Sequence, residues 1–255
     1  ILKKSFIEKD LSRAISTLEK IKSINQEDLY ARYTLAMLYL DSGEIGPARQ
    51  IASELFKQTP GHPVANRIEG VALYLLDDFE GALEKLQQSI SPMPDLPGFY
   101  FLGLASYKAG KLELALSNFQ KALDTSPEHE QSRLMVAQTL LKQGRVEDSI
   151  QQIKYILDRN ASNASAHNLL GSAYLHHKKY DLAMEHIGRA IQLNPGLAQA
   201  HLKKGLFNLA AGNKNQGESD LLNAVNAAPE VLNARLLLVT YHLRQHNYPT
   251  ALELL

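Results

Sequence analysis

The stretch "LLGSAYLHHKKYDLAMEHIGRAIQLNP", residues 169–195, decides the fold because its small residues and its proline recur along the chain. A shift of 34 residues carries Gly171 forward to Gly205, and two such shifts backward carry it to Gly103. Small residues and prolines that recur at a regular interval indicate a repeated structural unit rather than one reactive site. The other residues that correspond at this interval are Ala183 with Gly217, Ser149 and Ala115, Ala190 with Ala224, and Pro195 with Pro229 and Pro127.

Each recurring residue type has a physical role in a pair of helices. Glycine inside a helix costs about 1 kcal/mol relative to alanine, so Gly103, Gly171 and Gly205 predict places where the backbone is packed too closely for a side chain. We expect small residues such as Ala183 to meet this surface from the second helix. The glycines of "KAGK" and "KQGR" suit the left-handed residue that ends a helix. The recurring prolines end the second helices, because the residue before a proline avoids helical geometry.

These features resemble the tetratricopeptide repeat, which has two antiparallel helices in a unit of about 34 residues. The resemblance covers essentially the whole chain. It implies an all-α fold, a right-handed superhelical solenoid of antiparallel helix pairs, built as a single array over residues 1–255. The expected repeats span residues 29–62, 63–95, 96–129, 130–163, 164–197 and 198–231, with partial repeats at 1–28 and 232–255.

Both ends of the sequence fall within an expected repeat. Ile1 falls inside a first helix, and the final "YPTALELL" stops inside a second helix. Because no polar helix closes the array, we expect a fragment of a longer array whose apolar end faces can self-associate. The tryptophan that the family places near the start of each first helix is missing. The residues in its place are Arg32, Asn66, Phe99, Arg133, His167, His201 and Arg235.

The composition disfavours several classes of function. The chain has 27 Lys and Arg residues against 27 Asp and Glu residues, and this zero net charge predicts no nucleic-acid partner. The absence of cysteine excludes disulfides, thiolate zinc sites and cysteine nucleophiles. No apolar run approaches the ~18 residues of a membrane-spanning helix, so we expect no transmembrane segment.

The motifs that suggest catalytic or metal chemistry are incomplete. The stretch "LASYKAGKLE" resembles a phosphate-binding loop, but it lacks the first glycine and the final Ser or Thr of that motif. We expect His176, His177 and His186 to face solvent, because the first two are neighbours on one helix and the third lies on the next. No spacing of nucleophile and base stands out. The sequence therefore predicts a protein that is not an enzyme and that binds no cofactor or metal.

Arrays of this family usually bind partners in a concave groove lined by the first helices. The family framework gives an aromatic groove between roughly Tyr30 and Tyr107, with Arg67 and Lys108 as isolated cations. Tyrosine is enriched at binding hot spots, which favours an extended or helical peptide as the ligand. The alternative is that some rings pack between neighbouring first helices. The candidate groove residues are Tyr30, Tyr33, Met37, Arg67, Tyr74, Tyr100, Phe101, Leu104, Tyr107, Lys108, Gln138 and Asn168.

Four stretches resemble a more specific bacterial branch of the family. Together they cover roughly residues 96–255 and resemble the tetratricopeptide lipoprotein of the PEP-CTERM/exosortase protein-sorting and exopolysaccharide system. The resemblance implies a periplasmic or outer-membrane-associated protein, with a cytoplasmic location as the alternative. The stretches are "PGFYFLGLASYKAGKLELALSNFQKAL", "SRLMVAQTLLKQGRVEDSIQQI", "LLGSAYLHHKKYDLAMEHIGRAIQLNP" and "NARLLLVTYHLRQHNYPTALELL".

Three functions follow as alternatives. The first is a non-catalytic protein–protein interaction scaffold, which binds a peptide or protein segment in its groove for envelope protein sorting or exopolysaccharide export. The second is the specificity or regulatory domain of a larger enzyme, such as a glycosyltransferase. The third is a polysaccharide-binding module, which needs aromatic platforms on an exposed face. Helical repeats throughout the full-length reading frame would favour the scaffold, and an attached α/β segment would favour the enzyme.

Overall fold

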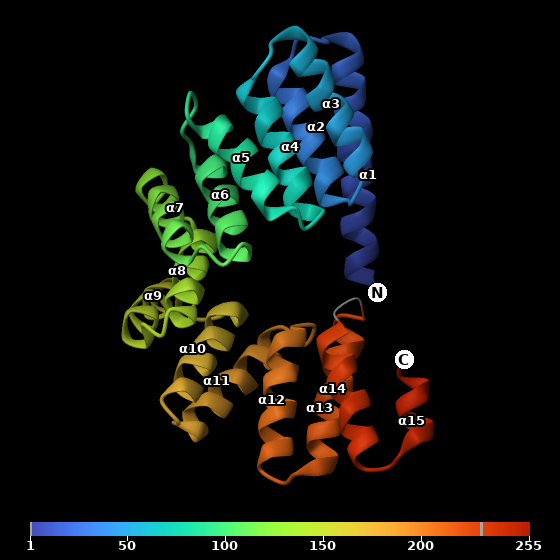
Figure 1. Cartoon of the computed structure of the whole chain (residues 1–255), viewed down its shortest axis with the longest axis vertical. Coiled ribbons are helices and arrows are strands. Elements are labelled where there is room, and N and C mark those ends of the chain that lie inside the picture. The colour runs from blue at the N-terminus through green and yellow to red at the C-terminus, as the bar shows by residue number, and fades with distance from the viewer. Residues whose placement is uncertain (1, 230–231) are drawn as a thin grey trace. The chain divides into compact units, whose positions relative to one another are not determined.

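The chain folds into consecutive α-helices (Figure 1). The computed structural model describes residues 2–229 and 232–255, and over these residues it contains no β-strand. None of the described helices has the length and the apolar character needed to cross a membrane. The helices are α1 (Leu2–Ile24), α2 (Leu29–Asp41), α3 (Ile45–Gln58), α4 (Pro63–Leu75), α5 (Phe79–Ile90), α6 (Leu96–Lys108), α7 (Leu112–Thr125), α8 (Glu130–Lys142), α9 (Val146–Arg159), α10 (Ala164–His176), α11 (Tyr180–Leu193), α12 (Ala198–Ala210), α13 (Lys214–Ala227), α14 (Leu232–Arg244) and α15 (Tyr248–Glu253).

The chain divides into two compact units, unit 1 (Ile1–Ser132) and unit 2 (Arg133–Leu255). In unit 1, α2 packs on α3, α4 on α5 and α6 on α7, and each pair also contacts the next. In unit 2, α10 packs on α11, α12 on α13 and α14 on α15 in the same way. Each unit is therefore a stack of antiparallel helix pairs, as the all-α prediction requires. The single array over residues 1–255 stays a prediction.

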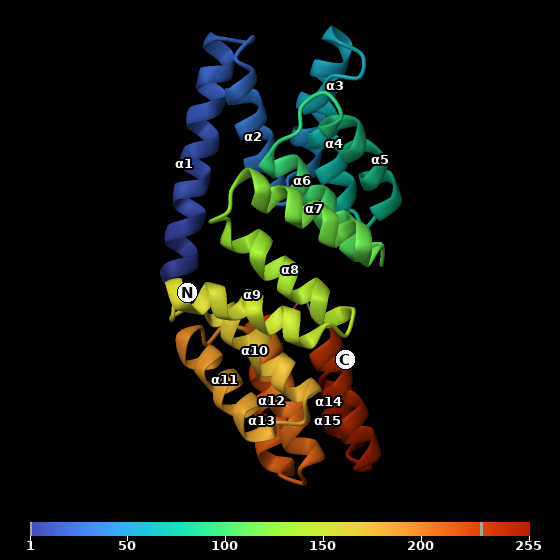
Figure 2. The same cartoon turned by 90° about the vertical axis from the view of Figure 1, so that its left-hand side faces the viewer.

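The N-terminal partial repeat differs from the prediction. A first helix that already contains Ile1 predicts a turn and then a second helix before residue 28. Instead, α1 is one uninterrupted helix that runs alongside α2 (Figure 1, Figure 2). The physical reason is that residues 2–24 contain neither glycine nor proline, so no residue type that readily ends a helix stands there. Ile1 itself, and the expected repeat boundary at residues 230–231, lie outside the described residues.

Left-handed residues end the first helices, as predicted. Gly110 and Gly144 both have φ of 77°, a conformation that glycine adopts without steric cost. Where the corresponding residue is not glycine, the turn keeps the same shape, and Asp77, Lys178 and His246 have φ of 59°, 57° and 57°. The turn geometry therefore follows the repeat, even where the residue type does not.

The helix glycines mark close contacts between paired helices, as predicted. A Cβ atom added to Gly103 would lie 2.6 Å from the ring of Phe119, on the second helix of the same pair. A Cβ atom added to Gly171 would lie 2.6 Å from Ile187 and 3.1 Å from the carbonyl oxygen of Ala183. The contact thus involves the predicted small residue and also the large side chain one turn beyond it. These interlocked pairs hold the first helices in fixed positions, and the candidate site lies on those helices.

Candidate functional site

The predicted groove residues lie on first helices in both units. Those from unit 1 are on α2, α4 and α6, whereas Gln138 and Asn168 are on α8 and α10 in unit 2. The unit 1 members thus lie on three successive first helices, and we call them the tyrosine face. The tyrosine face consists of Tyr30, Tyr33, Met37, Arg67, Tyr74, Tyr100, Phe101, Leu104, Tyr107 and Lys108.

The rings of the tyrosine face differ in how far they are buried. Tyr30 is 79% exposed, whereas the ring of Tyr100 is half-buried among other rings. Its centroid lies 5.8 Å from Phe101, 6.0 Å from Phe119 and 5.3 Å from His129. Aromatic pairs at these separations stabilise a fold beyond the area they bury. Packing against other rings therefore explains part of the aromatic content, and Tyr30 is left for another role.

Three hydroxyl groups of the tyrosine face are held in the protonated form. Burial raises the pKa of Tyr33, of Tyr74 and of Tyr100, and the neighbouring Tyr74 raises that of Tyr100 further. A protonated phenol both donates and accepts hydrogen bonds. The face therefore combines apolar rings with neutral polar groups, which suits the backbone of a peptide better than it suits an ion.

The prediction that Arg67 is an isolated cation is wrong. Arg67 is only 2% exposed, and its Nη1 lies 2.8 Å from Asp95 Oδ2. Its Nε donates to Ser89 Oγ at 3.3 Å, and its guanidinium lies 5.7 Å from the centre of the Tyr33 ring. Asp95 also accepts a 2.9 Å hydrogen bond from the backbone N–H of Gly98, at the start of α6. Arg67 therefore links three helix pairs inside unit 1, while Lys108 is exposed.

The two candidates in unit 2 also differ from each other. Gln138 is half-buried on α8, whereas Asn168 is only 4% exposed. The Oδ1 atom of Asn168 accepts a 2.8 Å hydrogen bond from Nζ of Lys203 on α12. Asn168 therefore connects two successive first helices. Whether any candidate residue in either unit contacts a partner stays a prediction.

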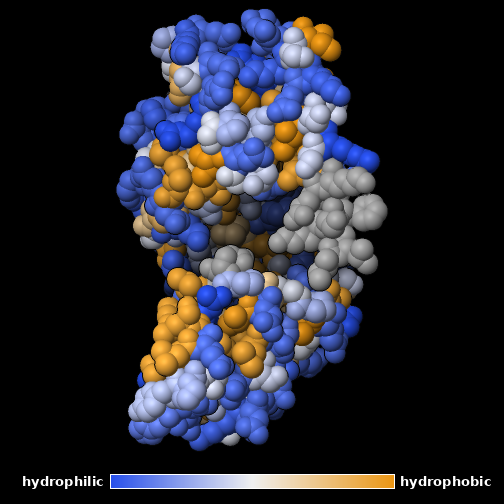
Figure 3. All heavy atoms as spheres, turned by 90° about the vertical axis from the view of Figure 1, so that its right-hand side faces the viewer, coloured by the Kyte–Doolittle hydropathy of each residue, from blue (hydrophilic) through white to orange (hydrophobic). Residues whose placement is uncertain are grey.

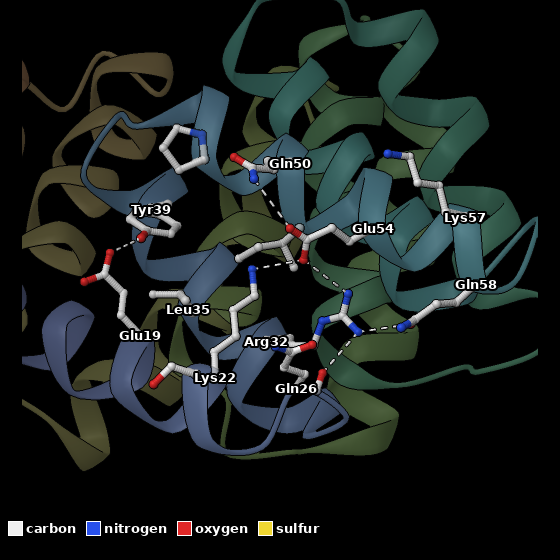
Figure 4. Close-up of a pocket in the computed structure, with 13 residues that line it drawn as sticks. Glu19, Lys22, Gln26, Arg32, Leu35, Tyr39, Gln50, Glu54, Lys57 and Gln58 are labelled. Carbon is white, nitrogen blue, oxygen red and sulfur yellow. Dashed lines mark hydrogen bonds and ion pairs between the residues drawn. The ribbon is translucent and has the colours of Figure 1, made fainter.

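A hollow of about 640 Å³ between α1, α2 and α3 was not predicted (Figure 4). Arg32, which occupies the position of the family tryptophan, reaches Glu54 at 3.5 Å and Gln58 at 3.1 Å. Lys22 reaches the same Glu54 carboxylate at 2.9 Å, so Arg32 and Lys22 share one anionic partner. The arginine in place of an aromatic residue was the sequence signal that a polar site replaces an apolar contact.

A second unpredicted feature is a histidine pair in unit 2. The Nδ1 atoms of His167 and His186 lie 3.0 Å apart, and the His186 ring stacks between those of His167 and Tyr174. The prediction that His186 faces solvent is wrong, because it packs under α10. Nε2 of His167 lies 3.1 Å from the carbonyl oxygen of Ala161, so neutral His167 donates there and accepts the Nδ1–H of His186. Within the described residues no third side chain completes a metal site.

The histidine pair predicts a loss of stability in mild acid. Burial lowers the pKa of His186, and the nearby His167 lowers it further. A histidine whose folded pKa is depressed stabilises the fold above its unfolded pKa of about 6.5, and this contribution is lost as pH falls through the folded pKa. We expect the free energy of unfolding to fall between about pH 7.5 and about pH 5, and His186→Gln to flatten this fall. Urea unfolding across that range measures it, with exposed His176→Gln as the control, and equal slopes in both variants would contradict it.

Comparisons with known proteins give one consistent result. Tetratricopeptide repeat family models match residues 5–70 and residues 134–198. The TPR repeat-containing protein MJ1428 of Methanocaldococcus jannaschii is 28% identical over 188 residues, which are 73% of this chain and 32% of that protein. Protein O-mannosyl-transferase TMTC1 of Homo sapiens is 29% identical over 94 residues, which are 37% of this chain and 11% of that protein. The chain thus spans about a third or less of these curated relatives.

A solved structure supports the same fold. YrrB, described as a TPR protein with an unusual peptide-binding site, matches with a TM-score of 0.56 at 20% identity, over 72% of this chain and 95% of that one. The two family matches together take in just over half of the chain. The repeat period, the stacked helix pairs and the matches agree, and the chain belongs to the tetratricopeptide repeat superfamily.

Proposed function

We propose that this protein is a non-catalytic interaction scaffold that binds a peptide or protein segment on the tyrosine face of unit 1. The observation that carries the proposal is the combination of exposed Tyr30 with half-buried, protonated tyrosines on successive first helices. Tyrosine provides a large contact area at a small cost in conformational entropy. The description of YrrB gives a precedent for a tetratricopeptide protein with a peptide-binding site.

A peptide is the ligand that this chemistry suits best. Its apolar side chains would contact the rings, and its backbone groups would exchange hydrogen bonds with the phenols of Tyr74 and Tyr100. Lys108, at the end of α6, is exposed and would favour an acidic residue toward one end of the segment. Arg67 takes no direct part, because its charge is already satisfied by Asp95.

The test selects peptides from a displayed random library on the whole chain and then measures their affinity for two variants. Tyr30→Ser combined with Tyr100→Phe keeps the half-buried ring in place, and we expect it to weaken binding about tenfold or more. Tyr248→Ser removes an exposed ring from unit 2 and is the control. Melting temperatures should match, because neither change empties a packed position. Equal affinity of both variants, or no enriched peptide, would contradict the proposal.

A second candidate is a repeat domain within a larger enzyme, such as a glycosyltransferase. The match to TMTC1 favours it, because that protein's name describes a mannosyl transferase and the match covers 11% of its length. In that case the tyrosine face would position a protein substrate for a catalytic part elsewhere in the polypeptide. The full-length reading frame distinguishes the two candidates, since only the enzyme has an attached non-repeat segment with catalytic residues.

We also propose that the protein works in a bacterial envelope, in protein sorting or exopolysaccharide export. This part rests on the resemblance of residues 96–255 to the exosortase-associated lipoprotein. Periplasmic or outer-membrane association, and self-association through apolar end faces, belong to the same proposal. Cell fractionation of the native host tests the location, and recovery with the cytoplasmic fraction would contradict it.

A further inference from the structure

Charge is unevenly distributed between the first and second helices of unit 2. From Arg133 onward, the second helices and α15 carry four basic and eight acidic residues. The first helices carry no acidic residue from that point, and their six basic residues are Arg133, Lys142, Lys203, Lys204, Arg235 and Arg244. A surface with one sign of charge attracts partners of the opposite sign and disfavours others. The first helices of unit 2 therefore differ in chemistry from the tyrosine face of unit 1.

Lys203 is a partly buried cation in this set, and among the described residues it contacts no carboxylate. Its neighbour Lys204 lies 3.3 Å from Oδ1 of Asp220, so the charge of Lys204 is matched. Lys203 instead donates to Oδ1 and to the backbone oxygen of Asn168, at 2.8 Å and 3.4 Å. Burial lowers the pKa of Lys203 to about 8, so it is still mostly protonated at neutral pH. A carboxylate beside it would favour the charged form and oppose this shift.

The Lys203–Asn168 contact leaves hydrogen-bond donors unused. An ammonium group has three N–H donors, and Asn168 accepts two of them. Because lysine can only donate, Asn168 must turn its oxygen toward Lys203, which leaves its Nδ2 amide as a donor. Within the described chain this amide has no acceptor, although Asn168 is only 4% exposed. One N–H of Lys203 and the amide of Asn168 therefore remain for an acceptor that the described residues do not supply.

Apolar side chains lie next to Lys203 along α12. Leu202, the residue before Lys203, lines a hollow of about 400 Å³ together with Leu236 and Leu237 of α14. Leu206, one turn along α12, is exposed, as is Leu236. Hydrophobic side chains gather in the lower half of Figure 3, where α14 and α15 face the viewer. We use the name leucine–lysine face for six residues of α10, α12 and α14, namely Asn168, Leu202, Lys203, Leu206, Leu236 and Leu237.

We infer that the leucine–lysine face binds a peptide segment in which one Asp or Glu side chain is flanked by apolar residues. The carboxylate accepts from Nζ of Lys203 and Nδ2 of Asn168, and the flanking side chains contact the leucines of α12 and α14. A charge-assisted hydrogen bond of this kind is about twice as strong as a neutral one, so it provides specificity within an apolar surface. The site is separate from the tyrosine face and does not depend on the function proposed for it.

The test uses synthetic peptides of about twelve residues that alternate leucine with serine, so that an extended chain places the leucines on one side. Three fluorescein-labelled peptides have amidated ends and carry a central Glu, Gln or Lys. A fourth carries Gln and a free terminal carboxylate. Fluorescence anisotropy with the whole chain should show the Glu peptide binding about tenfold tighter than the Gln peptide, with an advantage that shrinks as salt is added.

Matched variants locate the binding site. Lys203→Met should bring the Glu peptide to the affinity of the Gln peptide, whereas Lys214→Met, at an exposed position on α13, should change it less than about twofold. Leu236→Ser should weaken all the peptides alike, and exposed Leu222→Ser is its control. The variant Tyr30→Ser/Tyr100→Phe should bind as the unchanged chain does. Circular dichroism and melting temperature confirm that each variant folds.

Several outcomes would overturn the inference. Equal affinity for the Glu and Gln peptides would remove the role of the carboxylate. Tighter binding of the peptide with a free terminal carboxylate would assign the site to chain ends instead of side chains. Loss of binding in the tyrosine variant would place the peptide on unit 1, and absence of binding by every peptide would leave the face without this function.

Discussion

Replacing Arg67 with methionine is expected to lower the free energy of unfolding by about 2 to 4 kcal/mol, the range for a buried charged hydrogen-bond network that loses one member. Methionine fills most of the arginine volume, so loss of packing contributes little. The change instead removes the 2.8 Å contact with Asp95 and the hydrogen bond to Ser89. Because Asp95 remains partly solvated after the change, the expected loss is below that of a fully buried pair.

Arg49→Met provides the control for this prediction. Arg49 contacts Glu69 at 2.7 Å, slightly closer than Arg67 approaches Asp95, but its side chain is 48% exposed. An exposed ion pair contributes about 1 kcal/mol at most. Urea unfolding followed by circular dichroism should therefore separate the two variants by at least about 1 kcal/mol. Similar losses of unfolding free energy in the two variants would mean that burial does not decide the contribution of Arg67. If Arg67→Met stays folded but binds peptide more weakly, Arg67 belongs to the binding site after all.

Features of the fold that depend on interactions between neighbouring residues could be predicted from the sequence. Features that depend on contacts between distant residues could not. The period places Gly110 and Gly144 at left-handed turns, because turn geometry depends on a few neighbouring residues. The period also predicts close helix contacts at Gly103 and Gly171, because the two helices of every repeat pack against each other in the same way. Features that follow from the repeat itself could therefore be predicted from one chain.

The candidate site was harder to predict because partners come from other helices. The period puts Arg67 on a first helix, but Asp95 lies 28 positions later, at the start of α6, and the repeat pattern does not show that the two make contact. The stacking of His186 on His167 involves a residue that stands in place of the family tryptophan and a partner on the next helix. Likewise, the sequence shows Lys203 on a first helix and cannot show that Asn168, rather than a carboxylate, accepts its hydrogen bond. Such departures from the repeat are where specific contacts concentrate in both units.

Replacing Gly103 with alanine is expected to destabilise the protein by about 2 to 3 kcal/mol, toward the upper end for overpacking a core. The new Cβ atom would lie 2.6 Å from the ring of Phe119, which is 0% exposed. The ring has little room to move, because Ala115 and Ala122 on the same helix are also fully buried. This steric cost exceeds the gain of about 1 kcal/mol that alanine brings to a helix interior.

The same substitution at Gly188 isolates the steric cost. Gly188 lies within α11, and an added Cβ atom there meets nothing within 4 Å, so Gly188→Ala should stabilise the protein by up to about 1 kcal/mol. Adding Phe119→Leu to Gly103→Ala should then recover part of the loss, because the smaller side chain leaves room for the new methyl group. A positive coupling between the two sites would show that the helices of this pair meet through glycine and ring. Additive losses would instead mean that the backbones separate, and the same separation would then displace Tyr100, which packs on the same ring.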